Sequence, residues 1–146
     1  MSQEAVDKLR KRCQDEPYPK LLDIEVLEIE PGRARTAMTF RPDMQNIFGK
    51  LHGGAIFSLL DEAFQLACNA HGQVAVALSL NIYYLAPPDQ GARLFAEARE
   101  VNATRKTALY DAEVWQEDGK KIATGQAQAY RVGHPLPIDE NGQLTS

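Results

Sequence analysis

The stretch from Ala55 to Ala70 constrains the fold more than any other part of the chain. It contains no Pro or Gly, and Gly72 follows it as a stop signal, so it predicts a helix. At about 100° per residue, its polar side chains occupy roughly 100° of the circumference; they are Ser58, Asp61, Glu62, Gln65 and Asn69. The remaining surface is apolar. Such a helix must be buried on most sides, with one polar seam, and the rest of the chain has to wrap around it.

Six segments flanking this helix carry the alternation and turn signals of β-strands. Two precede it and four follow it, at residues 21–30, 32–40, 74–85, 92–101, 106–117 and 121–132. Glu30-Pro31-Gly32 and Asp118-Gly119 indicate hairpins. In 74–85, strict alternation would place the even-numbered residues on one face and the odd-numbered ones, Ser79 among them, on the other.

The last predicted strand carries a row of small side chains on one face, at Ala123, Gly125, Ala127 and Ala129. Such a row lets a helix approach the sheet closely. We therefore expect an α+β architecture in which a strongly curved antiparallel sheet wraps around one long helix. One helix covers only one face of such a sheet, so we expect another subunit to close the sheet edges and the polar seam.

Length and composition predict a single domain of residues 20–132, preceded by a helical segment, 1–19, and followed by a tail, 133–146, that is loop or disordered. A net charge of −4 argues against a general nucleic-acid surface. Cys13 and Cys68 have no metal-ligand spacing. Neither a signal peptide nor an apolar run long enough to span a bilayer is evident, so we expect a reducing, cytoplasmic setting.

Gly53-Gly54 lies just before the predicted helix, where unpaired backbone N–H groups favour an oxyanion. Asp61 follows about two turns later beside apolar neighbours, so we expect its pKa to be raised. Donors at a helix start together with a carboxylate are suited to acyl transfer. From spacing alone, a solvated helix face and a simple glycine turn explain these residues equally well.

The ordered residues Asn46, Gly49, His52-Gly53-Gly54 and Asp61 resemble the pattern of hotdog-fold acyl-CoA thioesterases of the phenylacetate-degradation type. Supporting matches lie at 77–87, Arg105-Lys106-Thr107, Tyr110-Asp111, Asp118-Gly119 and Ile122-Ala123, so that the resemblance covers roughly residues 20–131. The resemblance implies a homodimer, and a dimer of dimers as the homotetramer, with sites built across the interface.

The resemblance also implies a role for each site residue. The Gly53 N–H would polarise the thioester carbonyl. Asp61 of the other protomer would activate water as a general base or attack as a nucleophile. Asn46 would orient water or the acyl group, and His52 would hydrogen-bond near the thioester or brace its loop. Ser79 would help to place the water, or serve as a polar filler.

Arg105 and Lys106 are expected to bind the phosphates of coenzyme A, although paired cations on a hairpin are also commonly just solvated. Coenzyme A is then part of the substrate, and no separate cofactor or metal is expected. Two other functions stay open. One is a hotdog dehydratase acting on a hydroxyacyl thioester, and the other is a non-catalytic acyl-CoA-binding module.

The sequence leaves the acyl group undefined. Ile47, Phe48, Phe57 and Tyr83 are candidates to line an apolar pocket for an aryl or medium-chain acyl group. His71, next to Gly72, is predicted to cap the C-terminus of the central helix.

Overall fold

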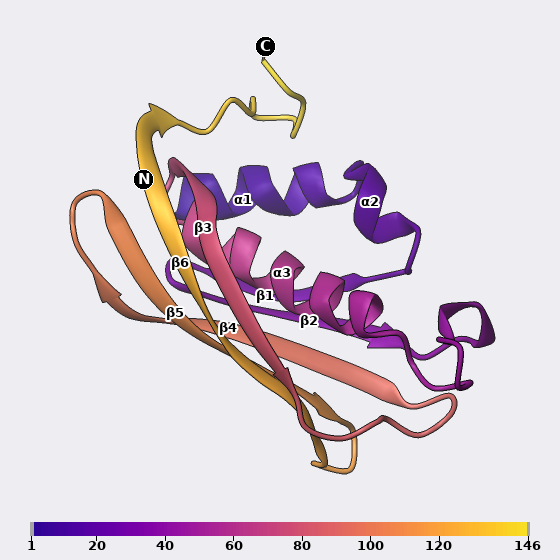
Figure 1. Ribbon diagram of the computed structural model, residues 1–146. Helices are drawn as coiled ribbons and strands as arrows, with labels where there is room; N and C mark the ends of the chain where they lie inside the picture. The colour runs from indigo at the N-terminus through magenta and orange to yellow at the C-terminus, as the bar shows by residue number, and fades with distance from the viewer. Residues whose placement is uncertain (1, 146) are drawn as a thin grey trace.

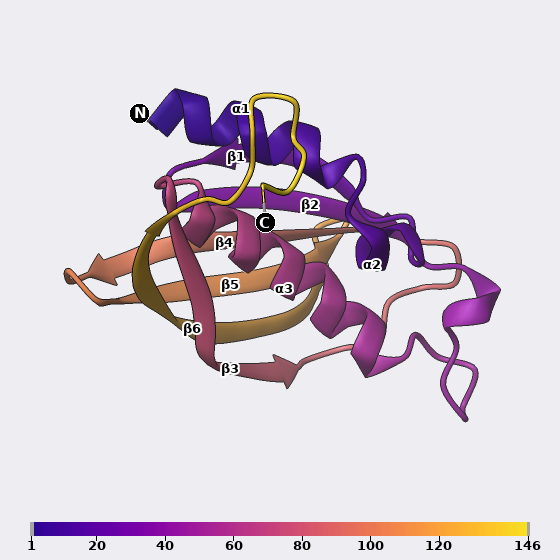
Figure 2. The same ribbon diagram turned by 90° about the horizontal axis from the view of Figure 1, so that it is seen from above.

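The computed structural model describes residues 2–145, which form one curved antiparallel sheet around a long helix (Figures 1 and 2). The six strands are ordered β1-β2-β4-β5-β6-β3. The elements are α1 (Ser2–Cys13), α2 (Pro17–Lys20), β1 (Glu25–Glu30), β2 (Arg33–Thr39), η1 (Pro42–Met44), α3 (Gly53–Asn69), β3 (Gln73–Tyr84), β4 (Arg93–Ala103), β5 (Thr107–Gln116) and β6 (Lys121–Pro135). No helix among the described residues is long and apolar enough to cross a membrane.

Helix α3 lies in the concave face of the sheet, as the apolar run predicts (Figure 2). Leu59, Leu60 and Ala63 are fully buried in the core. The small residues predicted on one face of β6 are all buried, so the sheet can curve closely around the helix. Thr36 of β2 donates a hydrogen bond from its hydroxyl to the Leu59 carbonyl oxygen at 2.9 Å. The predicted hotdog architecture is confirmed.

Strand β3 departs from the strict alternation that its sequence predicts. Ala77 pairs with Ala129 while Ser79 pairs with Gln128, so Leu78 has no partner of its own and forms a β-bulge. Beyond the bulge, Leu80 and not Ser79 packs against the core. The even-numbered residues therefore do not share one face along the whole strand, because one extra residue exchanges the two faces.

The N-terminal segment covers part of the polar seam that we expected a second subunit to close. Tyr18 in α2 hydrogen-bonds Ser58 through the two hydroxyls at 2.9 Å, and Gln65 Nε2 donates to Glu16 Oε2 at 2.8 Å. Glu62 of the same seam is buried. Only part of the seam therefore remains uncovered by the N-terminal segment, and this part includes the partly buried Asp61.

The chain after β6 is an ordered loop packed on α1, and β6 itself continues to Pro135, three residues beyond its predicted end (Figure 1). Residues 138–144, here called the C-terminal turn, close through an antiparallel bridge between Ile138 and Leu144. Lys11 Nζ of α1 donates to the Glu140 carbonyl oxygen at 2.8 Å. The disordered alternative for this segment is therefore wrong, because contacts with α1 hold it in place.

Candidate active site

The start of α3 presents a backbone donor and a histidine. His52 is the N-cap, and its Nδ1 accepts a hydrogen bond from Gly54 N at 2.9 Å. A neutral imidazole that accepts at Nδ1 carries its proton on Nε2, which is then able to donate. Within residues 2–145, nothing accepts from Gly53 N–H. This end of the helix therefore offers a free amide donor, next to a histidine that caps the helix.

Gly53 is required here by a close neighbour. Tyr84 at the end of β3 donates from its hydroxyl to the Gly53 carbonyl oxygen at 3.1 Å. A Cβ at position 53 would lie 3.1 Å from Tyr84 Cζ, tighter than ordinary van der Waals contact. Glycine therefore lets the tyrosine ring pack against the helix start and fix the position of the first peptide unit.

Asn46 shapes the loop before α3 with one half of its amide. Its Oδ1 accepts from Phe48 N at 2.8 Å and from Lys50 N at 3.0 Å. Both bonds need an oxygen, so they also fix which way the side-chain amide points. Its amide nitrogen remains as a donor toward a bound molecule. Any role of Asn46 toward substrate is therefore that of a hydrogen-bond donor.

Asp61 lies two turns into α3 and is partly buried. Burial raises the pKa of its carboxyl group above the usual value, and the nearby negative charge of Glu16 raises it further. The raised pKa makes the carboxylate a stronger base than a solvated aspartate. The direction agrees with the expectation from sequence, and Glu16 is a cause that the sequence did not indicate.

A second group of acids lies directly behind Asp61. Gln65 Nε2 donates to Glu16 Oε2 at 2.8 Å and to Glu62 Oε1 at 3.1 Å, which holds the two glutamates together. Burial, a hydrogen bond with Glu16 and the charges of Glu16 and Asp61 raise the pKa of Glu62 to about 9. Glu62 therefore holds a proton at neutral pH.

Ligand-type atoms of Cys13, Glu16 and Glu62 lie within 4.8 Å of one another. The sequence spacing gave no sign of this group, because its members come from two distant segments. Burial raises the pKa of the Cys13 thiol to about 12. Burial thus favours the protonated, uncharged form of both the Cys13 thiol and the Glu62 carboxyl group.

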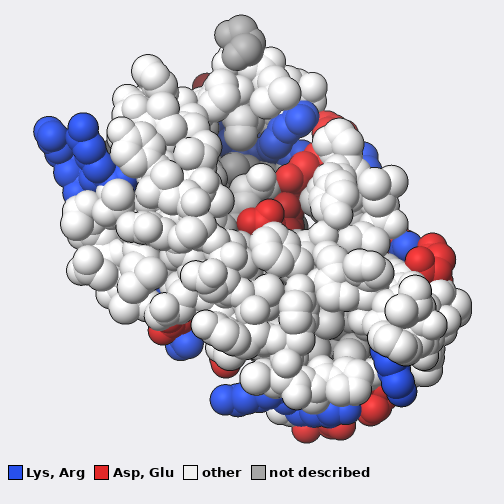
Figure 3. Space-filling view, viewed as in Figure 1, with Lys and Arg blue, Asp and Glu red and all other residues white. Residues whose placement is uncertain are grey.

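A cavity of about 520 Å³ opens beside Asp61 between α1, α3, the first half of β3 and the C-terminal turn. The space-filling view shows the molecule hollowed there, with acidic and basic atoms on the walls (Figure 3). Most of the lining is apolar, including Phe64, Val74 and Leu136. Its polar lining residues are Arg12, Glu16, Asp61, Gln65 and Asn69.

The structure does not bring all the predicted site residues together within one protomer. Eight residues of α3 separate Asp61 from Gly53, which at about 1.5 Å per residue is roughly 12 Å. A thioester carbon would have to lie about 3 Å from both groups, and within this chain they are too far apart for that. Ser79 is exposed on β3 and pairs with the exposed Gln128.

Arg105 and Lys106 lie in the β4–β5 turn, at the opposite end of the sheet from the loop that precedes α3 (Figure 2). Both are exposed, and within residues 2–145 neither forms an ion pair. Ile47 and Phe48 are 92% and 78% exposed, so within one protomer they line no pocket. His71 does not cap α3; its Nε2 bonds Glu100 Oε1 at 2.9 Å, and Ala70 is the C-cap.

Comparison with known proteins identifies the family of this chain. The family model described as "Thioesterase superfamily" matches residues 48–123, more than half of the chain. The chain belongs to the thioesterase superfamily. It is 32% identical to the acyl-coenzyme A thioesterase PaaI of Escherichia coli, over 91% of this chain and 95% of that protein.

Solved structures agree. The E. coli PaaI structure superimposes with a TM-score of 0.87 at 31% identity, covering 92% of this chain and 97% of that one. The TT0310 protein of Thermus thermophilus gives 0.77 at 42% identity, covering 80% and 98%. Smu.793 of Streptococcus mutans, solved bound to acetyl CoA, gives 0.73 at 26% identity, covering 77% and 90%. This chain is a hotdog thioesterase of the PaaI type and thus a thioester hydrolase.

Sequence reasoning on this thioesterase missed Tyr84 and the Glu16–Glu62 pair. The helical pattern places Glu62 in the polar seam, but its partner Glu16 lies 46 positions earlier in the chain. No local pattern reports a contact of that separation. The adjacent Asp61-Glu62 carboxyl groups on a helix that must be buried were the available signal, because buried carboxyl groups need a partner or a proton.

Proposed function

We propose that this thioesterase hydrolyses acyl-CoA and that each site is shared by two protomers of a homodimer. Asp61 of one protomer would act with Gly53, His52 and Asn46 of its partner. The observation that carries the proposal is the free Gly53 N–H about 12 Å along the same helix from Asp61. Two helices running antiparallel would bring each donor to the other protomer's carboxylate.

Two relatives support coenzyme A as the carrier. E. coli PaaI is an acyl-coenzyme A thioesterase, and the S. mutans homologue was solved with acetyl CoA. The exposed cations Arg105 and Lys106 would bind the nucleotide phosphates, Arg105 through its bidentate guanidinium group. The acyl group we propose is aryl or medium-chain. Two cysteine thiols without a disulfide fit a reducing cytoplasm.

The edge strand β3 supports self-association. Val76, Leu78 and Tyr83 are exposed along it, and β3 pairs only with β6 in the described chain. An exposed apolar edge strand is normally paired or covered. We propose that β3 lies at the dimer interface and that two dimers associate into a tetramer.

The reaction follows from these positions. Asp61 takes a proton from water as the water oxygen attacks the thioester carbonyl carbon. The oxyanion that forms is held by the partner's Gly53 N–H, while His52 Nε2 and the Asn46 amide can donate nearby. Collapse of this intermediate breaks the carbon–sulfur bond, and the proton on Asp61 passes to the coenzyme A thiolate. Ser79 would help to position the water. A covalent acyl-enzyme trapped in a single turnover would assign Asp61 the nucleophile role instead.

The proposal is tested by following thiol release from a panel of acyl-CoA esters. Asp61→Asn keeps the shape of the side chain and removes its basicity, so kcat should fall by about 10²–10⁴ while KM changes little. Asp7→Asn, an exposed residue of α1, provides the same change of charge and should leave kcat unchanged. Binding without turnover in the wild type would indicate an acyl-CoA-binding module instead.

Mixing two inactive variants tests the shared site directly. Each heterodimer of Asp61→Asn with Asn46→Ala keeps one site in which both residues are wild type. Random exchange should therefore restore about a quarter of the wild-type activity, because half of the dimers carry one intact site of two. Activity that stays at the level of the separate variants would show that each site lies within one protomer.

A further inference from the structure

The cavity beside Asp61 has the size and lining of an acyl site. Its volume of about 520 Å³ is several times the roughly 150 Å³ that accommodates a benzene ring in a protein interior. Leu9 of α1, Phe64 of α3 and Val74 of β3 contribute apolar walls. Asp61 lies on the same wall, so a carbonyl held near its carboxylate can extend its acyl group into this space.

The far wall is built by the C-terminal turn, and local contacts make that wall rigid. Ile138 and Leu144 line the cavity and pair across the turn. Asp139 Oδ1 accepts from Asn141 N at 2.8 Å and from Gln143 N at 2.9 Å. These bonds fix the conformation of the turn, and its contacts with α1 fix where it lies.

The C-terminal turn also packs closely against α1. Gly142 has φ +81°, and a Cβ there would lie 2.7 Å from Lys11 Cβ and 2.9 Å from Arg12 N. Gln143 Nε2 adds a bond to Asp15 Oδ2 at 3.4 Å. The turn thus touches the helix backbone closely and cannot move inward, so its position limits the length of the cavity.

The charges around the cavity select against an anionic acyl group. Asp61 and Glu16 both line it, and Glu62 lies behind them. Arg12 is the one cationic residue in the lining among the described residues. A terminal carboxylate on the acyl group would lose its hydration in an apolar space next to two acids.

Resting on the proposed thioesterase function, we propose that a neutral apolar acyl group of medium length lies in this cavity. Ile138 and Leu144 of the C-terminal turn set the greatest length that fits. The cavity belongs to the protomer that supplies Asp61. The specificity for the acyl group thus depends on a segment outside the strands and helix of the hotdog domain.

The test is the dependence of kcat/KM on acyl length, from butanoyl-CoA to hexadecanoyl-CoA. Leu144 is 59% exposed, so Leu144→Ala shortens the wall without opening the core. The longest acyl group that is hydrolysed well should become longer, with a gain of about fourfold for each methylene newly buried. Val101→Ala, an exposed residue on β4, should leave the profile unchanged. The wild type should prefer hexanoyl-CoA to adipoyl-CoA.

A second variant moves the whole turn. Gly142→Ala introduces the clash with Lys11 and should relax the length limit, giving a flatter profile. Gly91→Ala is the matched control, because Gly91 has φ +73° and nothing within 4 Å of an added Cβ. The control carries the same backbone strain without the displacement of the turn.

The outcomes separate this inference from the proposed function. Hydrolysis with a length profile that neither Leu144→Ala nor Gly142→Ala alters would overturn the cavity assignment and leave the thioesterase function standing. If the wild type hydrolyses no acyl-CoA, the proposed function fails. Calorimetry of the binding of the same esters then tests whether the cavity holds the acyl group. A length limit in binding that Leu144→Ala relaxes supports the assignment, and its absence overturns it.

Discussion

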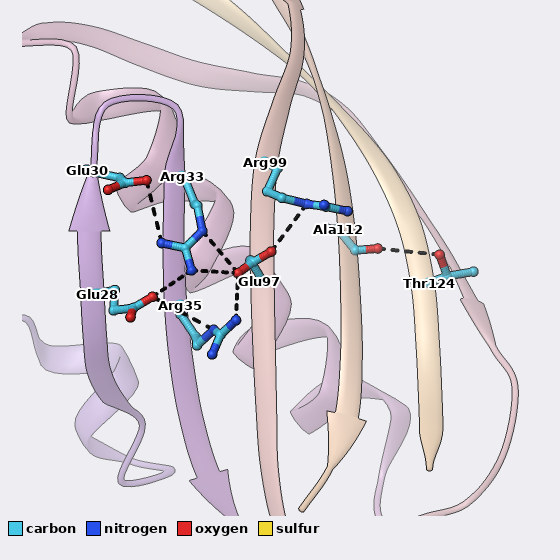
Figure 4. A network of polar contacts seen from close by, with 8 residues as sticks. All are labelled: Glu28, Glu30, Arg33, Arg35, Glu97, Arg99, Ala112 and Thr124. Carbon is cyan, nitrogen blue, oxygen red and sulfur yellow. Dashed lines mark hydrogen bonds and ion pairs between the residues drawn. The ribbon is translucent and has the colours of Figure 1, made fainter. Parts of the chain in front are cut away.

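Two glutamates of this thioesterase are buried to the same extent and have opposite surroundings. Glu62 on α3 and Glu97 on β4 are each 7% exposed. Glu97 lies on the outer face of the sheet, where Arg33, Arg35 and Arg99 reach its carboxylate at 2.9, 2.9 and 3.2 Å (Figure 4). This cluster joins β2 to β4 and extends through Glu28 on β1. Its charges are neutralised by pairing.

Glu62 has no such partner. Among the described residues, its polar neighbours are Gln65, the Cys13 thiol and the acids Glu16 and Asp61, so it is neutralised by keeping a proton. The difference shows that burial alone does not decide the state of a carboxyl group. The neighbouring charges decide it. The outer cluster holds strands together, whereas the inner one keeps a proton and negative charge beside the proposed base.

Removing Glu97 should have the largest effect. Glu97→Ala leaves Arg99 without its carboxylate, and Arg33 and Arg35 with only the exposed acids of β1. It should lower the free energy of unfolding by roughly 2–4 kcal/mol, the lower part of the range applying because the arginines are partly exposed. Urea denaturation measures this. Glu28→Ala removes an exposed acid from the same cluster and should cost under about 1 kcal/mol. Equal losses in the two variants would show that burial of the carboxylate contributes nothing.

Replacing Glu62 should act in the opposite direction. Its pKa is about 9 in the folded protein against 4.5 as the ordinary value, so only the unfolded chain ionises as the pH rises above 4.5. Stability contributed by this group is complete below that pH and declines toward pH 9. Glu62→Gln removes the decline and should raise the free energy of unfolding at pH 7 by up to about 3 kcal/mol.

The gain in Glu62→Gln should vanish near pH 4, where both states of the wild type are protonated. The amide oxygen of the new side chain can still accept from Gln65. Glu117→Gln, an exposed acid at the β5–β6 hairpin, should show no such pH dependence. A variant that is less stable than the wild type at every pH would mean that Glu62 is ionised and paired, like Glu97.

Arg105 differs from the arginines that surround Glu97. The arginines of the outer cluster already bind carboxylates, so they are unavailable to phosphate, whereas Arg105 is exposed. Arg105→Ala should raise KM for acyl-CoA by about tenfold, the value of one charge-assisted bond, without lowering kcat. Lys121→Ala at the other end of the sheet should not change KM. An unchanged KM in Arg105→Ala would remove this residue from the coenzyme A site.

The sequence predicts the fold well wherever one dominant pattern applies. The helix expected at 55–70 is α3 at Gly53–Asn69, because its apolar surface allows no other placement. All six strands occur, although β1 begins four residues later than predicted, after a turn at Asp23 with φ 51°. Alternation fails at Leu78, because a bulge depends on the pairing of two strands and leaves no mark in one of them.

The candidate site is predicted less completely, because its contacts span long separations in the chain. The pattern from Asn46 to Asp61 indicates the donors and the base, and the structure identifies the hydrogen-bond partners of these groups. The sequence could not indicate that Glu16 contacts Gln65 or that the C-terminal turn packs on α1, since both contacts exist only in the folded chain. The prediction for His71 was wrong for the same reason. A local rule placed it as the cap of the central helix, but its side chain bonds Glu100 on β4 instead.

The smallest effect expected is a shift of the pH–rate profile. Asp61 must be ionised to accept a proton, so activity falls as the pH drops through its pKa. Burial raises that pKa first and Glu16 raises it further. Glu16→Gln removes one of these two causes, while Glu62 stays protonated because burial is the larger cause of its own shift. The acidic limb of kcat/KM should therefore move to lower pH.

Two comparisons make this shift specific to the inner cluster. Asp7→Asn carries the same change in net charge on an exposed part of α1 and should leave the limb in place, since solvent and salt screen it. Glu97→Gln, a buried acid on the outer face, should also leave it unchanged. A limb that moves equally in all three variants would mean that net charge sets the base, and that the acids behind Asp61 have no special influence on it.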